Sequence, residues 1–254
     1  MECDGSSARS RSAASAMGAV DLRMAIQLYD LAGAEDDRRF SPYCWRVKMA
    51  LKHKGLAFET IPWRFTDKDA IAASGSKTVP VLVDGGRAVY DSWAIATYLE
   101  EAYPSRPALF EGGEAQALSL FFSHWTVRAV HVPLLRAIVL DVFGHLHEKD
   151  RAYFRESREK RFGMPLEQAG AEPKKWLAEF RGALEPVRPL LAQSEFVSGK
   201  GPGFADYILF GPFQWARSVS PLRLLEPDDP VYAWRERMLT LWDGYARQAK
   251  GYPV

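Results

Sequence analysis

The feature that most constrains the fold is a change of pattern at the segment Pro104-Ser105-Arg106-Pro107. Ahead of it, short apolar runs typical of strands alternate with helical periodicity, and after it nearly every patterned stretch is helical. The segment itself has the composition of a linker. Because 254 residues are long for one ordinary domain, we expect an α/β domain over residues 24–104 and an all-α domain over residues 105–254.

Local signals predict the elements of the first domain. Ser41 and Pro42 are typical of a helix start and Gly55 of a helix end, while Asp84-Gly85-Gly86 is typical of a hairpin turn. The expected order is βαβ, a loop, then ββα. We expect a strand at 26–31, a helix at 42–54, a strand at 57–61, a loop at 62–78 with one helical turn, strands at 79–83 and 87–90, and a helix at 92–103.

The second domain is expected to contain only helices. We predict them at 114–142 with a bend near Pro133, and at 149–161, 173–192, 204–219 and 230–249. At the other end of the chain, residues 1–23 are rich in Ser, Ala and Arg without an apolar core region, which excludes a secretory signal. Met24 directly precedes the first strand, so we expect it to be the true start, with residues 1–23 an extension or a disordered leader.

Composition excludes several classes of function. Hydrophobic residues make up 47% and charged residues 26%, and the formal net charge is only +1, so neither a nucleic-acid surface nor an acidic arm is expected. No stretch is long and apolar enough to span a bilayer. The two cysteines, Cys3 and Cys44, do not suggest a disulfide, which fits a reducing, cytoplasmic location. The five histidines lack the spacing of a metal site, and we expect no metal.

Three short motifs carry the chemistry that we predict. Ser41 would hold its hydroxyl at the positive end of a helix, where an anion or a thiolate is stabilised, although the same residue could be only a helix cap. In Thr78-Val79-Pro80-Val81 we predict a cis bond before Pro80, which would turn the backbone N–H and C=O of Val79 outward to pair with an extended peptide. The alternative is a bulge in an edge strand.

The third motif is Asp91-Ser92, at the start of the next helix. Ser92 is expected to cap that helix and, with the free N–H groups, to bind a carboxylate, while Asp91 would pair with an ammonium group. The three motifs together describe a tripeptide-like ligand with an amino-acid end, a central peptide bond and a thiol. Glutathione has this chemistry.

Read in order, Ser-Pro-Tyr-Cys, Thr-Val-Pro-Val and Asp-Ser-Trp-Ala-Ile-Ala-Thr-Tyr-Leu resemble the glutathione-binding half of a cytosolic glutathione transferase. The resemblance covers about residues 24–243 and implies a thioredoxin-like domain followed by an all-helical one, glutathione as co-substrate, and a homodimer. Gly203-Phe204-Ala205-Asp206 resembles the family's buried helix start, in which Asp206 is structural. Gly203 stands where Ser, Thr or Asn is more usual.

A subgroup resemblance is more specific. The stretches Ser-Pro-Tyr-x-Trp-Arg, Leu-Lys-His-Lys-Gly and Asp150-Arg151-Ala152-Tyr153-Phe154-Arg155 resemble the bacterial β-etherase group and its fungal-specific class A relatives. The resemblance implies that Ser41 stabilises the thiol. It also implies cleavage of β-aryl ethers as a candidate reaction, in aromatic compound catabolism or detoxification.

The predicted mechanism is attack by an activated glutathione thiolate on a small hydrophobic or aromatic electrophile. A hydrogen bond from Ser41 and the helix N-terminus would lower the thiol pKa by about one to two units. The electrophile would bind between the domains near Phe122, Trp125 and Arg128, although an aromatic stripe of this kind is more often part of the core. Two alternatives remain, a thiol transferase that uses Cys44 and a non-catalytic glutathione-binding module.

Overall fold

The computed structural model describes residues 25–253, and the prediction for residues 1–23 lies outside them. The first domain is a four-stranded sheet in the order β2-β1-β3-β4, with β1 and β2 parallel and the other pairs antiparallel. Its elements are β1 (Ile26–Leu31), α1 (Pro42–His53), β2 (Phe58–Trp63), the 3-10 helix η1 (Lys68–Ser74), β3 (Val81–Asp84), β4 (Arg87–Tyr90) and α2 (Ser92–Ala102). This order confirms the predicted thioredoxin-like architecture.

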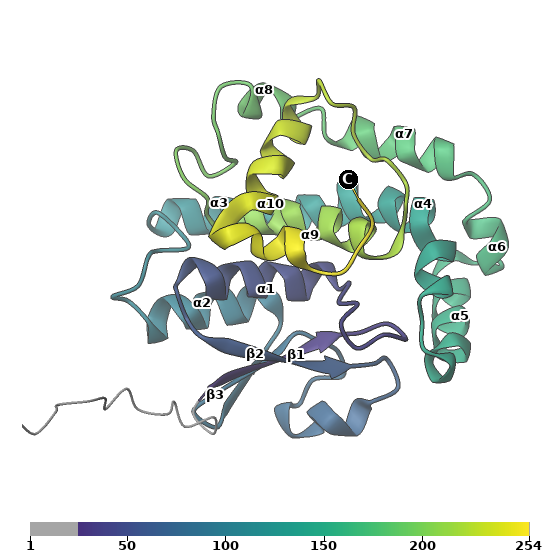
Figure 1. Cartoon of the computed structure of the whole chain (residues 1–254), viewed down its shortest axis with the longest axis horizontal. Coiled ribbons are helices and arrows are strands. Elements are labelled where there is room, and N and C mark those ends of the chain that lie inside the picture. The colour runs from purple at the N-terminus through teal and green to yellow at the C-terminus, as the bar shows by residue number, and fades with distance from the viewer. Residues whose placement is uncertain (1–24, 254) are drawn as a thin grey trace, which may run out of the picture.

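The second domain is entirely helical in the described residues. In Figure 1, α1 and α2 lie between the sheet and this helical domain. Its elements are α3 (Gly113–Trp125), the π-helix η2 (Thr126–Val130), α4 (His131–Gly144), α5 (Glu148–Phe162), α6 (Leu166–Ala169), α7 (Pro173–Ala183), α8 (Arg188–Leu191), α9 (Phe204–Val219) and α10 (Pro230–Gln248). No helix in residues 25–253 combines the length and the apolar character that a membrane crossing needs.

The helix predicted to bend near Pro133 changes its winding close to that residue. The helix changes its winding at η2, before the proline, and continues as α4. Because the η2 segment includes Ala129, the carbonyl that would otherwise clash with the ring of Pro133 is already displaced. Proline thus disturbs the helix one turn upstream of its own position.

Two other predicted helices are interrupted. The stretch 173–192 divides into α7 and α8 around Pro186, which cannot continue a helical hydrogen-bond ladder. The stretch 230–249 leaves helical geometry at Leu241–Gly244, where Trp242 and Asp243 have positive φ angles of 49° and 58°.

Asp206 anchors the start of α9, as predicted for a structural residue. It is fully buried, and its carboxylate accepts hydrogen bonds from the N–H groups of Val197 (2.7 Å), Ser198 (3.1 Å) and Gly203 (3.1 Å), and from the Trp234 indole (2.8 Å). Gly203 is required for steric reasons, because a Cβ atom there would lie 2.5 Å from the Ser198 hydroxyl.

The two domains meet most closely where α9 crosses the start of α1. A Cβ atom at Gly211 would lie 2.4 Å from the carbonyl oxygen of Pro42, so only glycine permits this separation of the helices. Pro42 directly follows Ser41. The packing of α9 therefore sets the position of the first turn of α1.

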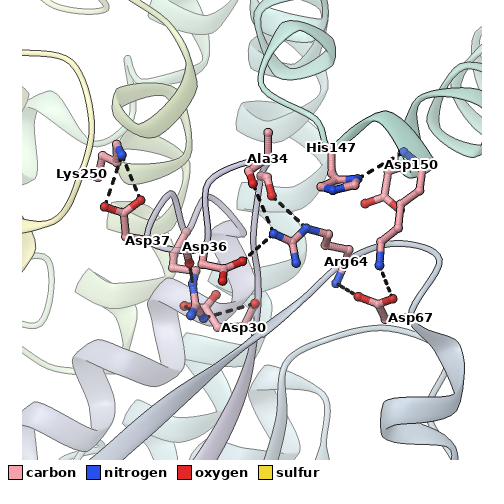
Figure 2. A network of polar contacts seen from close by, with 12 residues as sticks. Asp30, Ala34, Asp36, Asp37, Arg64, Asp67, His147, Asp150 and Lys250 are labelled. Carbon is pink, nitrogen blue, oxygen red and sulfur yellow. Dashed lines mark hydrogen bonds and ion pairs between the residues drawn. The ribbon is translucent and has the colours of Figure 1, made fainter.

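A polar network joins the domains at a second place. Asp150, buried at the start of α5, accepts hydrogen bonds from the N–H of Phe65 (2.9 Å) and from the N–H and hydroxyl of Thr66 (3.0 and 2.8 Å). Asp67 forms a neighbouring ion pair with Lys149, and Figure 2 shows Asp67 beside Arg64, which pairs with Asp36. Figure 1 shows α5 reaching down beside the first domain, and this network holds it there.

Candidate functional site

Ser41 lies at the N-cap of α1 and opens onto a cavity. Its side chain is only 3% exposed, and Oγ accepts a hydrogen bond from the N–H of Cys44 at 3.2 Å. Within residues 25–253 no nitrogen or oxygen atom accepts a hydrogen bond from the Ser41 hydroxyl, which lies beside the Cys44 thiol, and the residue lines the cavity. The hydroxyl can therefore cap the helix and still donate a hydrogen bond to a bound anion.

The peptide bond between Val79 and Pro80 is cis, which confirms the prediction. Strand β3 begins only at Val81. In the described part of the chain, neither the N–H nor the C=O of Val79 makes a hydrogen bond, and Val79 lines the same cavity as Ser41. The backbone of Val79 is therefore free to pair with an extended ligand.

Asp91, and not Ser92, is the N-cap of α2, which corrects the predicted cap. Asp91 Oδ1 accepts hydrogen bonds from the N–H groups of Trp93 (2.8 Å) and Ala94 (3.2 Å), and the residue has a φ of 71°. Its side chain is exposed, whereas Ser92 is buried. Within residues 25–253 the second oxygen of the Asp91 carboxylate accepts no hydrogen bond.

The register of the sheet brings the three motifs to one end. Tyr90, the residue before Asp91, pairs with Val81, which directly follows Pro80. Val81 also pairs with Tyr29 near the end of β1, and β1 leads to Ser41. The register therefore places the three motifs toward one end of the sheet, although Ser41 and Val79 line the cavity and Asp91 and Ser92 lie outside its lining.

The cavity of about 870 Å³ lies between the two domains. Ser41, Tyr43 and Val79 line it from the first domain, and the facing wall comes from η2, α4 and α5 with one tryptophan each from α7 and α9. Its aromatic lining residues are Phe40, Tyr43, Trp63, Phe65, Phe154, Phe162, Trp176 and Trp215. The cavity can therefore hold an aromatic molecule next to a thiol at Ser41.

The predicted pocket residues fall in different places. Arg128 lines the cavity, but Phe122 and Trp125 are not among its lining residues, and their rings stack on each other with centroids 5.1 Å apart. The prediction missed the α5 wall, including Phe154 and Arg158. Their spacing of four residues puts them on one helix face, but this spacing does not show which element the face packs against.

Cys44 is poorly placed for chemistry. It is fully buried, its Sγ lies 3.9 Å from the carbonyl oxygen of Tyr29, and it does not line the cavity. Burial, and then the nearby carboxylate of Asp30, raise the pKa of the Cys44 thiol well above its usual value. A neutral, enclosed thiol is a weak nucleophile.

Arg46 is buried near the cavity without an ion pair in the described residues. No carboxylate in residues 25–253 lies within ion-pair distance, and the 2% exposed guanidinium instead donates to the Ser123 hydroxyl (3.0 Å) and faces His131 Nε2 at 3.4 Å. Burial lowers the pKa of Arg46 to about 10. Burial and Arg46 together lower the pKa of His131 well below its usual value.

The protonation of His131 follows from this contact. A guanidinium has only donors, so Nε2 of His131 must accept and Nδ1 must carry the proton. A neutral imidazole at the cavity wall adds no charge to the site. Across the described residues, no group of three or more His, Cys, Asp or Glu side chains is placed to hold a metal ion.

The fold and these motifs define a class, the two-domain thioredoxin-fold proteins that bind a thiol peptide at the start of α1. Family models described as "Glutathione S-transferase, N-terminal domain" and "Glutathione S-transferase, C-terminal domain" match residues 37–107 and 117–225. The probable glutathione S-transferase GSTU6 of Oryza sativa subsp. japonica is 30% identical over 214 residues, which cover 78% of this chain and 80% of that protein. The chain belongs to the glutathione S-transferase family.

Two solved fungal structures are similar over nearly the whole chain. Glutathione transferase GSTFuA3 from Phanerochaete chrysosporium superposes with a TM-score of 0.70 at 26% identity, covering 88% of this chain and 94% of that one. CsGST63524 of Ceriporiopsis subvermispora, solved in complex with glutathione, gives 0.71 at 25% identity, covering 89% and 94%. These relatives support glutathione binding and transferase activity, and leave the electrophile open.

Proposed function

We propose that Ser41 activates the thiol of glutathione for attack on a small hydrophobic or aromatic electrophile. The observation that carries this proposal is the Ser41 hydroxyl, which sits at the N-terminus of α1, faces the cavity and keeps its proton available. The thiol would lose its proton to solvent, and the thiolate would accept the hydrogen bond from Ser41. The helix N-terminus adds a favourable field for the negative charge.

In the proposed complex, the backbone of glutathione pairs with Val79 beside Pro80. The amino-acid end then reaches α2, where Asp91 faces the ammonium group and the hydroxyl and N–H of Ser92 face the carboxylate, since Asp91 already binds the N–H groups of Trp93 and Ala94. The sheet register, which brings Tyr90 opposite Val81, supports this placement. The electrophile occupies the aromatic part of the cavity, where Arg128 is the predicted pocket residue that lines it.

The transfer step forms a bond between the glutathione sulfur and an electrophilic carbon. The leaving group departs with the bonding electron pair, and a phenolate is the leaving group if the substrate is a β-aryl ether. A cavity of about 870 Å³ with eight aromatic rings supports a substrate of that kind. Cleavage of a β-aryl ether is therefore the first reaction to test, in a pathway of aromatic catabolism or detoxification.

Three features of the whole protein belong to the same proposal. The chain would divide into a glutathione-binding domain at 24–104 and a helical domain at 105–254, and it would act in the cytoplasm. It would form a homodimer, for which the exposed apolar side chains of Leu118 (69%) and Phe121 (71%) on α3 are candidate contacts.

Two measurements test the activity. The protein should be retained on immobilised glutathione, and with glutathione it should turn over at least one member of a panel of β-aryl ethers and aryl halides. Retention without turnover on any member would support the alternative of a non-catalytic binding module. Reduction of mixed disulfides without carbon-centred transfer would support the alternative that uses Cys44, which its burial disfavours.

A further inference from the structure

The wall of the cavity opposite Ser41 is cationic. Four arginines line the cavity, and none of the lining residues in the described chain is Asp or Glu. The whole chain has 33 basic and 32 acidic residues, so the excess is local to this cavity. The four arginines are Arg128 on η2, Arg136 on α4, and Arg158 and Arg161 on α5.

Arg158 is the most enclosed of the α5 pair and has no acidic partner in residues 25–253. Its guanidinium lies over the ring of Phe154 at 4.5 Å and within 5.5 Å of the ring of Phe65, and Nη1 donates to the Ser157 hydroxyl at 2.9 Å. Its Nε is buried without a hydrogen-bond partner. The donors of Arg158 are therefore oriented by stacking but not used up.

The composition of α5 does not explain this absence of a partner. Arg155, less than one turn earlier on the same helix, pairs with Glu159 at 3.1 Å and with Glu167 at 2.7 Å on the outer face. Arg158 and Arg161 point along the cavity side, and in the described residues neither has an ion pair. On α5, Arg155 therefore has acidic partners, whereas Arg158 and Arg161 on the cavity side have none in the described residues.

An unpaired guanidinium in this setting is costly. Burial, followed by repulsion from Arg161, lowers the pKa of Arg158 to about 10, so the group stays charged at neutral pH. A charge that is partly removed from water is destabilising unless an anion compensates it. Arg136 is compensated differently, since it lies over Trp176 at 4.4 Å and donates to the Ala169 carbonyl at 2.9 Å.

We infer that the electrophile is an aromatic carboxylate, whose anionic group binds Arg158 with help from Arg161 while its ring packs on Phe65 and Phe154. A guanidinium and a carboxylate form two parallel hydrogen bonds, which would use the donors that Arg158 leaves open. This inference rests on the proposed transferase function and adds the chemical class of its second substrate. A carboxylate of glutathione is the competing source of the anion.

A matched pair of electrophiles tests the inference. With 4-chloro-3-nitrobenzoate and its methyl ester, the glutathione thiolate forms a C–S bond and chloride leaves with the bonding electrons in both cases. Each kcat/KM is divided by the uncatalysed rate constant, because the two rings differ in intrinsic reactivity. We expect the wild-type protein to prefer the benzoate at least tenfold.

Variants of α5 identify the group responsible. Arg158→Met should lower the normalised kcat/KM for the benzoate at least tenfold and leave that for the ester within twofold, and Arg158→Lys should restore part of the loss. Arg155→Met, the matched control on the outer face, should change neither value by more than twofold. If Arg158→Met fails to fold, Arg161→Met is measured in its place. It should lower the normalised kcat/KM for the benzoate by a smaller factor and leave that for the ester unchanged.

A binding measurement separates this inference from the proposed activity. Trp63, Trp176 and Trp215 line the cavity, so their fluorescence reports binding of the benzoate or the ester without turnover. One outcome is that the protein binds the benzoate through Arg158 and yet shows no transfer activity. That result would overturn the proposed function but support the anion site. Equal affinity for the two compounds would overturn the inference. The inference would also be overturned if Arg158→Met lost affinity for glutathione but kept the wild-type preference between benzoate and ester. The anion that binds Arg158 would then be a carboxylate of glutathione.

Discussion

The Ser41 hydroxyl at the start of α1 caps the helix and, in the proposed mechanism, donates a hydrogen bond to the thiolate. Ser41 Oγ accepts from the N–H of Cys44 at 3.2 Å, and its own proton is free for a thiolate. Ser41→Ala should therefore lower turnover at neutral pH by about ten- to a hundredfold, or about 1.4–2.8 kcal/mol in barrier. Higher pH should partly rescue it, because solvent then deprotonates the thiol. Thiolate absorbance of bound glutathione, titrated against pH, measures the change directly.

The loss of the cap must be separated from the loss of the donor. Removing the Ser41 cap should cost about 1 kcal/mol of stability, which thermal melting records. Turnover is then measured well below the melting temperature. Superimposable thiolate titrations for both proteins would mean that Ser41 is only a cap and that backbone N–H groups stabilise the thiolate.

Asp91 requires a variant that keeps its structural role. Its carboxylate caps α2 and its φ is 71°, so Asp91→Ala would lose the cap and strain the backbone as well as lose the charge. Asn caps helices and tolerates this φ. Asp91→Asn should thus weaken glutathione binding by about 1.5–3 kcal/mol, the value of a hydrogen bond to a charged group. Calorimetry that gives the wild-type affinity would remove Asp91 from the ammonium site.

Cys44 should be dispensable for carbon-centred transfer. The thiol is enclosed, and burial raises its pKa, so Cys44→Ala should keep wild-type kcat within about twofold while its vacated volume lowers stability by about 1 kcal/mol. Turnover assays and urea unfolding measure the two effects. Abolished turnover, together with glutathione attached to Cys44 in the native protein by mass spectrometry, would favour the thiol transferase.

At the scale of elements, the contact of α9 with α1 carries a prediction. Gly211→Ala would place Cβ 2.4 Å from the carbonyl oxygen of Pro42, so the two helices must separate. We expect a loss of about 1–3 kcal/mol in the free energy of unfolding and a fall in kcat, because Ser41 moves with Pro42. Urea unfolding and turnover at saturating glutathione measure the two effects.

Gly182 provides the matched control for this prediction. It lies in α7, and a Cβ atom there would have no neighbour within 4 Å. Gly182→Ala should therefore be neutral, or stabilising by up to about 1 kcal/mol, with unchanged turnover. Equal effects of the two substitutions would show that helix propensity, and not the approach to Pro42, determines the result.

Elements with strong local signals were predictable from the sequence. The capped starts at Pro42 and Phe204 lie where they were expected, because caps and hydrophobic periodicity act within one helical turn. The π winding of η2 beside Pro133 was predicted only as a bend, and the irregular backbone at Leu241–Gly244 was not predicted, since no residue pattern there specifies it. Tertiary packing determines the backbone conformation of such segments.

The candidate site likewise has parts that the sequence predicted and parts that it did not. The segments at Ser41, Val79-Pro80 and Asp91 carry short-range signals, and the sheet register gathers them. The cavity wall on α5 depends on how that helix docks, which the bonds from Phe65 and Thr66 to Asp150 determine over about 85 positions. A distant contact of this kind left no local pattern from which to choose α5 over Phe122 and Trp125.

At the scale of the whole molecule, a partly buried and a buried histidine couple stability to pH. The pKa of His53, lowered first by burial, and the pKa of His131, lowered by burial and Arg46, lie below the usual value in the folded protein. In the unfolded chain both return to about 6.5. Below that pH the unfolded chain binds protons that the folded protein does not, so stability falls as the pH falls.

The last prediction concerns His131, which is 7% exposed and accepts from Arg46. Its stabilising contribution is complete above pH 6.5 and decreases below it by up to about 1.4 kcal/mol per pH unit, until the folded protein also binds the proton. His131→Gln keeps an acceptor for Arg46 but cannot titrate. Urea unfolding at pH 5, 6, 7 and 8 should give a smaller loss between pH 7 and 5 in the variant than in the wild type. Equal losses would mean that His131 is protonated in the folded protein, and Arg46 would then face a second positive charge.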